Sequence, residues 1–232
     1  MKKPLRVTLI IVVSIVALAL MWKYGFTVVS TSELEAIAES EEFDAAEYVD
    51  KIWSSRIVGT IEENAVDLSK ILSEMETDAS GNASKEKLTE IAQKYGLITV
   101  GEAHVYMVKG EGNVIAVNTE SSVGTIEVKV KGYDGPISVL IYIGTRIPSD
   151  NSSIRDAVGI TFGEFKEQTQ YGKVAAEINK RVLSEVVGPL DKANLLGKTI
   201  EFEGAMTIRT FNLVNIDLSK VTIVPVKIVV KE

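Results

Sequence analysis

The chain has 232 residues, 46% hydrophobic and 25% charged, a composition that excludes a disordered protein, a multi-span membrane protein and two large domains. Residues 1–23 hold four basic residues and no acid, so the remainder has 21 basic against 32 acidic residues, a net charge of −11. An acidic body repels phosphate backbones, so we expect no nucleic-acid partner.

Cysteine and histidine usage limits the chemistry further. The absence of cysteine excludes disulfides, thiolate nucleophiles and cysteine-based metal sites. The single histidine, His104, lies in a predicted strand, where a packed or hydrogen-bonded ring is expected rather than a metal ligand. We therefore predict no metal site and no cofactor.

Residues 1–24 form a targeting segment. After a basic start, Val7 to Trp22 is an uncharged, almost wholly apolar run followed by Lys23. As a helix this run is about 24 Å long, short of the roughly 30 Å hydrocarbon core, but the flanking aromatic and basic residues suit the far interface. We favour a single-pass transmembrane anchor. A cleaved signal peptide is the alternative, because Ala17-Leu18-Ala19 is a small-x-small site.

The charge on either side of this run sets the orientation. Basic residues precede it and the acidic stretch Glu33 to Glu47 follows it, so we expect a cytoplasmic N-terminus and an extracytoplasmic body, periplasmic or extracellular. Residues 25–42 are predicted to be a linker. Residues 43–232 are predicted to form one domain, with a helical part at 43–96 and a sheet plus a long helix at 97–232.

The helical part shows start signals and apolar stripes. Asp44 with Glu47, and Thr60 with Glu63, each fit a capping box that marks a helix start. From the second box one stripe is expected to run through Ile61, Ala65, Leu68, Leu72 and Met75. A further stripe contains Leu88, Ile91, Ala92 and Tyr95, and Gly96 should end that helix in a left-handed conformation.

From Leu97 the apolar period changes to two, which predicts strands. We expect strands at 97–109, 114–118 and 125–131, with Gly110-Glu111-Gly112 as a hairpin turn between the first two. Ile137 to Ile143 is a continuous apolar run that predicts a central strand. Two strands close the chain, one from Gly197-Lys198 onward with a bulge at Gly204, and one at Val221 to Lys231 with Pro225 at an edge or a bulge.

Between these strands lies the longest patterned stretch, Gly144 to Val187. Thr161 and Glu164 fit a capping box, and Gly188-Pro189 is a stop signal. The predicted buried stripe of this helix contains Phe165, Tyr171, Val174, Ala175, Ile178, Val182 and Val186.

The order of elements predicts an α+β fold, in which an antiparallel sheet or barrel is packed by several amphipathic helices. If the central strand is left out, the order is that of an OB-type barrel, which opens to oligonucleotide or sugar ligands at one face. Another antiparallel sheet covered by helices is the alternative. Because fold does not fix function, this topology alone names no activity.

Three segments resemble a known bacterial family: FDAAEYVDKIW at Phe43 to Trp53, VKGEGNVIAVNT at Val108 to Thr119, and IRDAVGITFGEFKEQTQYGKVAAEIN at Ile154 to Asn179. They are similar to the predicted periplasmic lipoproteins of unknown function. Genes of that family tend to lie beside sugar ABC-transporter genes, so the resemblance implies a role near carbohydrate uptake. A chain without cysteine has no lipidation site, so an anchor or a cleaved signal must replace the lipid.

The stretch 144–187 also holds the candidate site residues. Gln168 and Asn179 fall within or beside the apolar stripe and so need hydrogen-bond partners. They either tie the helix to the hinge or face a ligand, together with Tyr171. Arg155 and Asp156 either anchor the loop 149–160 or, with Arg146, line a cleft for an anionic or polyol ligand.

No reaction is predicted. Ser152 and Ser153 lack a histidine placed as a base, and Glu201 with Glu203 follows the alternation of a solvated strand face. We expect a non-enzymatic, membrane-anchored extracytoplasmic module that binds a small polar ligand. The alternative is a module that docks onto ABC-transporter components, and a hydrolase is the least favoured of the three.

Overall fold

The computed structural model describes residues 43–78, 81–99 and 101–231. The chain divides into two compact units, Met1–Phe43 and Asp44–Glu232, and the fold below is that of the second unit. The expected anchor at 1–24 and linker at 25–42 lie outside the described residues. Among the helices that are described, none is both long enough and apolar enough to cross a membrane.

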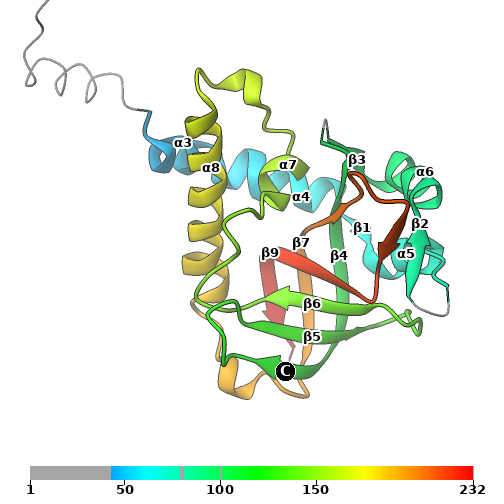
Figure 1. The fold of residues 1–232 in the computed structure, drawn as a ribbon. Coiled ribbons are helices and arrows are strands. Elements are labelled where there is room, and N and C mark those ends of the chain that lie inside the picture. The colour runs from blue at the N-terminus through cyan, green and yellow to red at the C-terminus, as the bar shows by residue number, and fades with distance from the viewer. Residues whose placement is uncertain (1–42, 79–80, 100, 232) are drawn as a thin grey trace, which may run out of the picture. The chain divides into compact units, whose positions relative to one another are not determined.

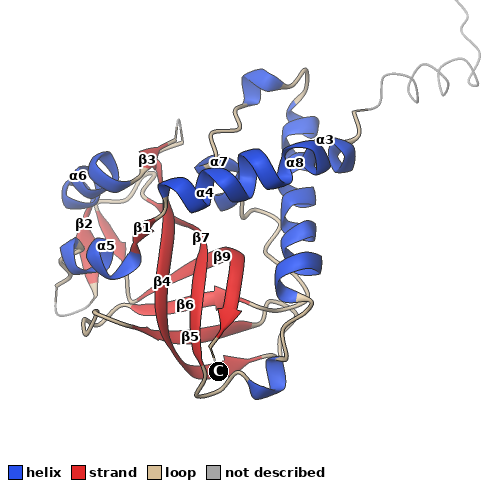
Figure 2. Ribbon diagram, turned by 180° about the vertical axis from the view of Figure 1, so that it is seen from behind, coloured by secondary structure: helices blue, strands red, loops and turns tan. Residues whose placement is uncertain are grey.

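The described part is a mixed α+β fold in which helices surround a sheet (Figures 1 and 2). Its helical segments are α3 (Ala45–Ile52), η1 (Trp53–Val58), α4 (Gly59–Asn64), α5 (Leu68–Glu74), α6 (Lys85–Tyr95), α7 (Ser153–Ala157), η2 (Phe162–Glu164), α8 (Gln168–Arg181), η3 (Val182–Val187) and η4 (Lys192–Asn194). Its strands are β1 (Val66–Asp67), β2 (Asn82–Ser84), β3 (Leu97–Ile98), β4 (Ala103–Asn118), β5 (Thr125–Val130), β6 (Ser138–Tyr142), β7 (Thr199–Arg209), β8 (Asn215–Asp217) and β9 (Lys220–Val230).

Five strands close into a barrel. They are hydrogen-bonded in the order β4-β5-β6-β9-β7, and β7 pairs again with β4. Only β6 and β9 run parallel within this ring. Strands β1 and β3 add to β4, while β2 and β8 form a separate antiparallel pair. The helices α7 and α8 lie in the connection from β6 to β7.

The barrel interior follows the predicted alternation. Ile126, Val128 and Val130 of β5 are buried, as expected from the sequence. Burial of such side chains contributes about 1.5–3 kcal/mol each, which makes this interior the main stabilising feature of the barrel. Helices α4 and α7 pack on β4 and β7, and α3 packs against α8.

The expected hairpin turn at Gly110-Glu111-Gly112 is wrong. These residues lie inside the single strand β4, which pairs with β7 from Ala103 to Asn113 and with β5 from Gly112 to Asn118. The glycines are needed for close approach. A Cβ on Gly110 would lie 2.8 Å from the Phe202 ring, and one on Gly112 would lie 2.5 Å from the Lys129 carbonyl oxygen. The predicted strands 97–109 and 114–118 are therefore largely one strand, β4. The predicted central strand, Ile137 to Ile143, corresponds to β6, the third strand of the barrel.

The expected helix start at Thr60 is also wrong. Helical turns run without a break from α3 through η1 into α4, so Thr60 lies inside a helix. The helix ends instead at Ala65, because Val66 and Asp67 pair with β4. Asp67 then caps α5 by accepting from the Ser69 N–H at 2.8 Å. The predicted single stripe is thus divided between two helices.

Two other boundary signals differ in detail. Gly96 ends α6 with φ of −144°, not in a left-handed conformation, and its need for glycine comes from the Val105 carbonyl oxygen, which lies 2.4 Å from the position of a Cβ. The Thr161–Glu164 capping box is present, but it caps the short turn η2, while α8 begins only at Gln168.

Several predicted features are confirmed. Asp44 caps α3 through its side chain. The register between β7 and β9 shifts at Gly204, the expected bulge, and Pro225 lies opposite that shift. His104 is packed, with 1% of its surface exposed.

We predict that Gly112→Ala destabilises the protein by about 1–3 kcal/mol, because its methyl group would overlap backbone atoms of β5. Gly172→Ala is the matched control. Nothing lies within 4 Å of a Cβ at Gly172, so in α8 alanine should stabilise by about 0.5–1 kcal/mol. Urea unfolding measures both changes, and a neutral Gly112→Ala would contradict the close approach of β4 and β5.

Candidate functional site

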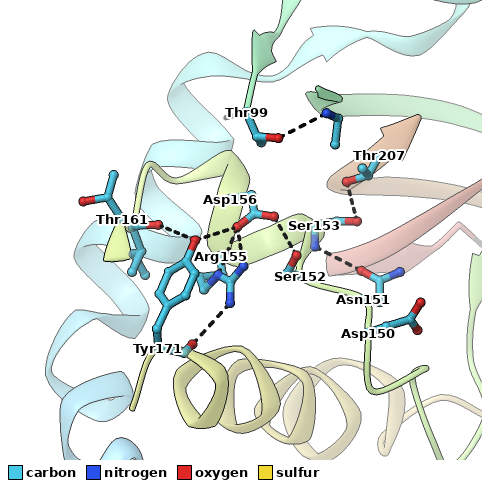
Figure 3. Close-up of polar contacts among 12 residues, drawn as sticks. Thr99, Asp150, Asn151, Ser152, Ser153, Arg155, Asp156, Thr161, Tyr171 and Thr207 are labelled. Atoms are coloured by element: carbon cyan, nitrogen blue, oxygen red, sulfur yellow. Dashed lines mark hydrogen bonds and ion pairs between the residues drawn. The ribbon is translucent and has the colours of Figure 1, made fainter. Parts of the chain in front are cut away.

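Arg155, Asp156 and Tyr171 form one polar cluster where α7 meets α8 (Figure 3). The Arg155 Nε and Nη2 donate to Asp156 Oδ1 at 3.0 and 2.8 Å, and Nη1 donates to the Tyr171 carbonyl oxygen at 3.2 Å. The guanidinium carbon lies 3.5 Å from the centre of the Tyr171 ring, a cation–π geometry. All three nitrogens of Arg155 are therefore used inside the protein.

The cluster is also largely removed from solvent. The side chains of Arg155 and Asp156 are 11% and 14% exposed. The Tyr171 hydroxyl lies 3.3 Å from Asp156 Oδ1, and burial together with this negative charge raises the pKa of Tyr171. The second Asp156 oxygen accepts from the Ser152 hydroxyl at 2.6 Å. These contacts join α7 to α8.

Asn179 joins α8 to the loop that precedes α7. It is 7% exposed, and its Nδ2 donates to the Asn151 carbonyl oxygen at 2.8 Å. Asn151 Oδ1 in turn accepts from the Ser153 N–H at 3.0 Å, and the Ser153 hydroxyl accepts from Thr207 of β7 at 2.8 Å. Of the two roles left open for Gln168 and Asn179, Asn179 has the structural one, a tie between helix and hinge. From Asn151 the tie continues through Ser153 to Thr207 of the barrel (Figure 3).

Two predicted site residues lie elsewhere. Gln168 is exposed, so its expected place beside the buried stripe is wrong, because α8 begins at this residue and not at Thr161. Arg146 is exposed as well. Its backbone N–H donates to the Ser122 carbonyl oxygen at 2.9 Å, and it does not line the cleft described below.

Sequence reasoning missed a second joint, between η1 and the 161–164 turn. Both Glu164 carboxylate oxygens accept from Arg56, at 2.6 and 2.9 Å, and one also accepts from the Tyr48 hydroxyl at 3.1 Å. The hydrogen bonds from Arg56 lower the pKa of Glu164 to about 2. The capping box identified Glu164, but no local signal identifies a partner 108 positions away.

A cleft of about 510 Å³ lies beside this relay. One wall is the loop at 148–153 with the start of α7, and the other contains the end of β7, the segment 213–218 and the start of β9. Among the predicted site residues, only Asp156 lines it. The polar residues of the cleft that the sequence did not single out are Tyr142, Asp150, Asn151, Thr207, Arg209, Asp217, Lys220 and Thr222.

Every carboxylate of the cleft has a partner within the protein, and for two of them that partner is an arginine. Asp150 Oδ2 lies 2.9 Å from Arg209 Nη1, and hydrogen bonds from Arg209 lower the pKa of Asp150. Asp156 is held by Arg155 as described above. The pKa of Asp217 is lowered by hydrogen bonds from Ser219 and, to a smaller extent, by the charge of Lys220. The carboxylates of the cleft are thus already engaged within the protein.

Tyr142 of β6 is the aromatic residue of the cleft. It is half-buried, and burial is the main cause that raises its pKa. The nearby side chains of Asn151 and Thr222 act in the opposite direction and lower this pKa in part. An aromatic surface surrounded by amide and hydroxyl groups is suited to a small polar ligand.

The acidic residues of β7 each have a lysine partner. Glu201 lies 2.5 Å from Lys231, and Glu203 lies 3.2 Å from Lys227. Among the described residues, no three histidine, aspartate or glutamate side chains gather closely enough to hold a metal ion.

The model of the family described as predicted periplasmic lipoprotein (DUF2291) matches residues 15–229, nearly the whole chain. The protein belongs to this family. Its function is not known, and its description supports an extracytoplasmic, membrane-associated location. Among curated proteins none matches the chain in sequence.

One solved structure shares the fold. The chain is similar to the crystal structure of an OB-fold protein from Thermotoga maritima, at 19% identity and a TM-score of 0.62. The match covers 82% of this chain and 100% of the other. The OB-like barrel expected from the order of elements is therefore confirmed, and the likeness carries no function with it.

We predict that Glu164→Gln lowers the free energy of unfolding by about 1 kcal/mol at neutral pH, after allowance for partial solvent exposure of the pair. The pKa of Glu164 in the fold is about 2, below the ordinary value of 4.5. Its contribution is therefore complete above pH 4.5 and is lost as the pH falls toward 2. Urea unfolding between pH 3 and pH 7 should show wild type and variant converging at the acid end.

The matched control is Glu120→Gln, a change at an exposed loop residue, which should alter stability by less than about 0.5 kcal/mol. A difference between wild type and Glu164→Gln that stays constant with pH would contradict the pairing of the Glu164 carboxylate with Arg56.

Proposed function

We propose that this protein is a membrane-anchored extracytoplasmic module that binds a small, uncharged, polyhydroxylated ligand in the cleft between the 148–153 loop and β9. The apolar run within residues 1–24 supplies the anchor. The ligand class is that of sugars, which agrees with the link to carbohydrate uptake that the family resemblance implies. The module then acts beside a transport assembly in the same membrane.

The observation that carries this proposal is that the carboxylates of the cleft already have partners within the protein. Asp150 and Asp156 are each paired with an arginine, and Asp217 accepts from the Ser219 N–H, so a ligand that binds through these carboxylates would have to displace an existing partner. The hydroxyl and amide groups of the walls make hydrogen bonds without net charge. A neutral polyol can exchange those bonds for its own and places its apolar ring face on Tyr142.

The residues that join α7 and α8 contribute by fixing one wall of the cleft. Asn179 holds the carbonyl group of Asn151, and Arg155 holds Asp156. Both walls are therefore attached to buried elements. Preorganised walls reduce the entropy cost of ordering the site when a ligand binds.

We also propose that the module binds its ligand without transforming it. Asp150 and Asp156 are paired with arginine and Asp217 accepts from the Ser219 N–H. Hydrolysis of a glycosidic bond needs one carboxyl group that stays protonated near neutral pH. Such a group would have a raised pKa, whereas those of Asp150 and Asp217 are lowered.

We predict that neutral mono- and disaccharides at about 10 mM include one that raises the melting temperature of the protein. For a dissociation constant of about 0.1 mM, the added stability is about 2.7 kcal/mol, or a shift of roughly 5–10 °C. Thr222→Val removes one hydroxyl from the cleft wall and should weaken that binding by about 3- to 30-fold, as measured by calorimetry.

Thr125→Val is the matched control, because Thr125 is also a half-buried strand residue but does not line the cleft. It should bind the sugar as the wild type does. If no neutral sugar shifts the melting temperature while a charged one does, the ligand class is wrong. Equal binding by both threonine variants would place the ligand outside this cleft.

A further inference from the structure

The connection from β7 to β8 carries an exposed apolar tip. Phe211 is 61% exposed, Leu213 46% and Val214 73%. The segment from Thr210 to Ile216 contains no charged residue, although 25% of the chain is charged. Three large apolar side chains within four residues are thus open to solvent. Such a cluster indicates an interaction surface, whereas single exposed apolar residues do not.

The tip is held rigidly at both ends. At its start, Thr210 is fully buried, and its hydroxyl donates to the Glu102 carbonyl oxygen. At its end, the Val214 carbonyl oxygen accepts from the Lys85 N–H at 3.0 Å, and β8 pairs with β2. In Figure 1 this connection lies beside β2. Asn212 makes the turn with φ of 56°, which asparagine tolerates better than most residues. The backbone contacts at both ends thus hold the apolar side chains at the surface.

We infer that this tip enters the outer surface of the lipid bilayer to which the protein is attached. Two other partners for the tip, a second copy of the chain and a different protein, fit less well. A stable dimer needs about 800 Å² per partner, more than one short turn supplies. A protein partner would be expected to add charged or hydrogen-bonding groups at the rim, but the nearest ion pairs, Lys85 with Glu102 and Arg209 with Asp150, are already formed within the chain.

The tether makes the lipid surface available. The linker expected at 25–42 spans at most about 60 Å when extended, whereas a body of this size has a radius of gyration of about 16 Å. Any face of the body can therefore reach the bilayer. Because the attached body already has a high effective concentration at the surface, even a weak apolar contact is sufficient. The net charge of −11 on the remainder of the chain means that attraction to anionic lipids does not drive this contact.

The inference rests on the membrane attachment proposed above. It does not depend on which ligand the cleft binds, although Leu213 of the tip also lines the cleft. The chain has no cysteine, so one introduced cysteine can carry a nitroxide label without background. The experiment uses the full chain with Val214→Cys, reconstituted into vesicles of phosphatidylcholine and phosphatidylglycerol (3:1). The matched control is Ser122→Cys, an exposed position on the connection between β4 and β5.

Two collision rates of the label are measured, one with oxygen, which concentrates in lipid, and one with a nickel complex, which stays in water. Their ratio tells whether the labelled residue lies in lipid or in water. We expect the Val214 label to collide at least about threefold more with oxygen relative to nickel than the Ser122 label does. Adding Phe211→Asp to the Val214→Cys chain should return the label to water. Adding Phe162→Asp, a change at another exposed aromatic residue (51% exposed), should not.

Three results would overturn the inference. Equal collision ratios at Val214 and Ser122 would place the tip in water. An immobilised Val214 label that meets neither oxygen nor nickel would indicate contact with protein, either a partner or a second copy. Chains that remain with the soluble fraction on flotation would refute the membrane attachment, and the lipid contact of the tip with it. Sugar binding in the cleft is measured separately, by calorimetry on the unlabelled chain, so failure of the sugar proposal and failure of this inference can be distinguished.

Discussion

Closure of the barrel through β4 is the constraint on which the remaining structure depends. This strand pairs with β7 along its first part and with β5 along its second, so it joins both ends of the sheet. It can do so only because Gly110 and Gly112 leave room for the Phe202 ring and for the backbone of β5. Once the ring is closed, the end of β7 and the start of β9 are fixed, and these form one wall of the cleft.

The second wall is fixed by side chains rather than by strand pairing. The 148–153 loop has few backbone partners of its own and takes its position from Asn179 and from the Ser153–Thr207 contact. Arg155 and Asp156 perform the same task for α7. Because these polar groups are used to hold the wall, they have little capacity left to meet a ligand. The groups that remain for a ligand, such as those of Tyr142 and Thr222, come from the strands.

The helix α8 is therefore best understood as a support. Its apolar side, with Val174 and Ile178 buried, packs onto the body, and its polar buried group is used for the hinge. The joint between Arg56 and Glu164 adds a third attachment, which ties η1 to the turn before α8. The stretch 144–187 thus acts mainly by fixing the shape of the cleft. Of the site residues predicted from it, only Asp156 lines the cleft.

Local signals in the sequence predicted the elements that depend on neighbours in the chain. The alternation Ile126, Val128, Val130, the stop at Gly188-Pro189 and the bulge at Gly204 are all visible in short segments, because strand faces and helix ends are set by residues a few positions apart. The same reasoning misjudged Gly110-Glu111-Gly112, since paired glycines in a turn and in a tightly packed strand look alike until the facing residue is known.

By itself, the sequence determined the α+β class, the acidic body and some of the residues that fix the hinge, Arg155, Asp156 and Asn179, because composition and periodicity carry that information. The tertiary structure alone decided which strands close the barrel, which carboxylates have cationic partners, and where the cleft lies. Arg56 and Glu164 are separated by 108 positions, and Ser153 and Thr207 by 54. Such pairs form because the closed barrel and its packed helices bring distant segments together, and no local pattern encodes that arrangement.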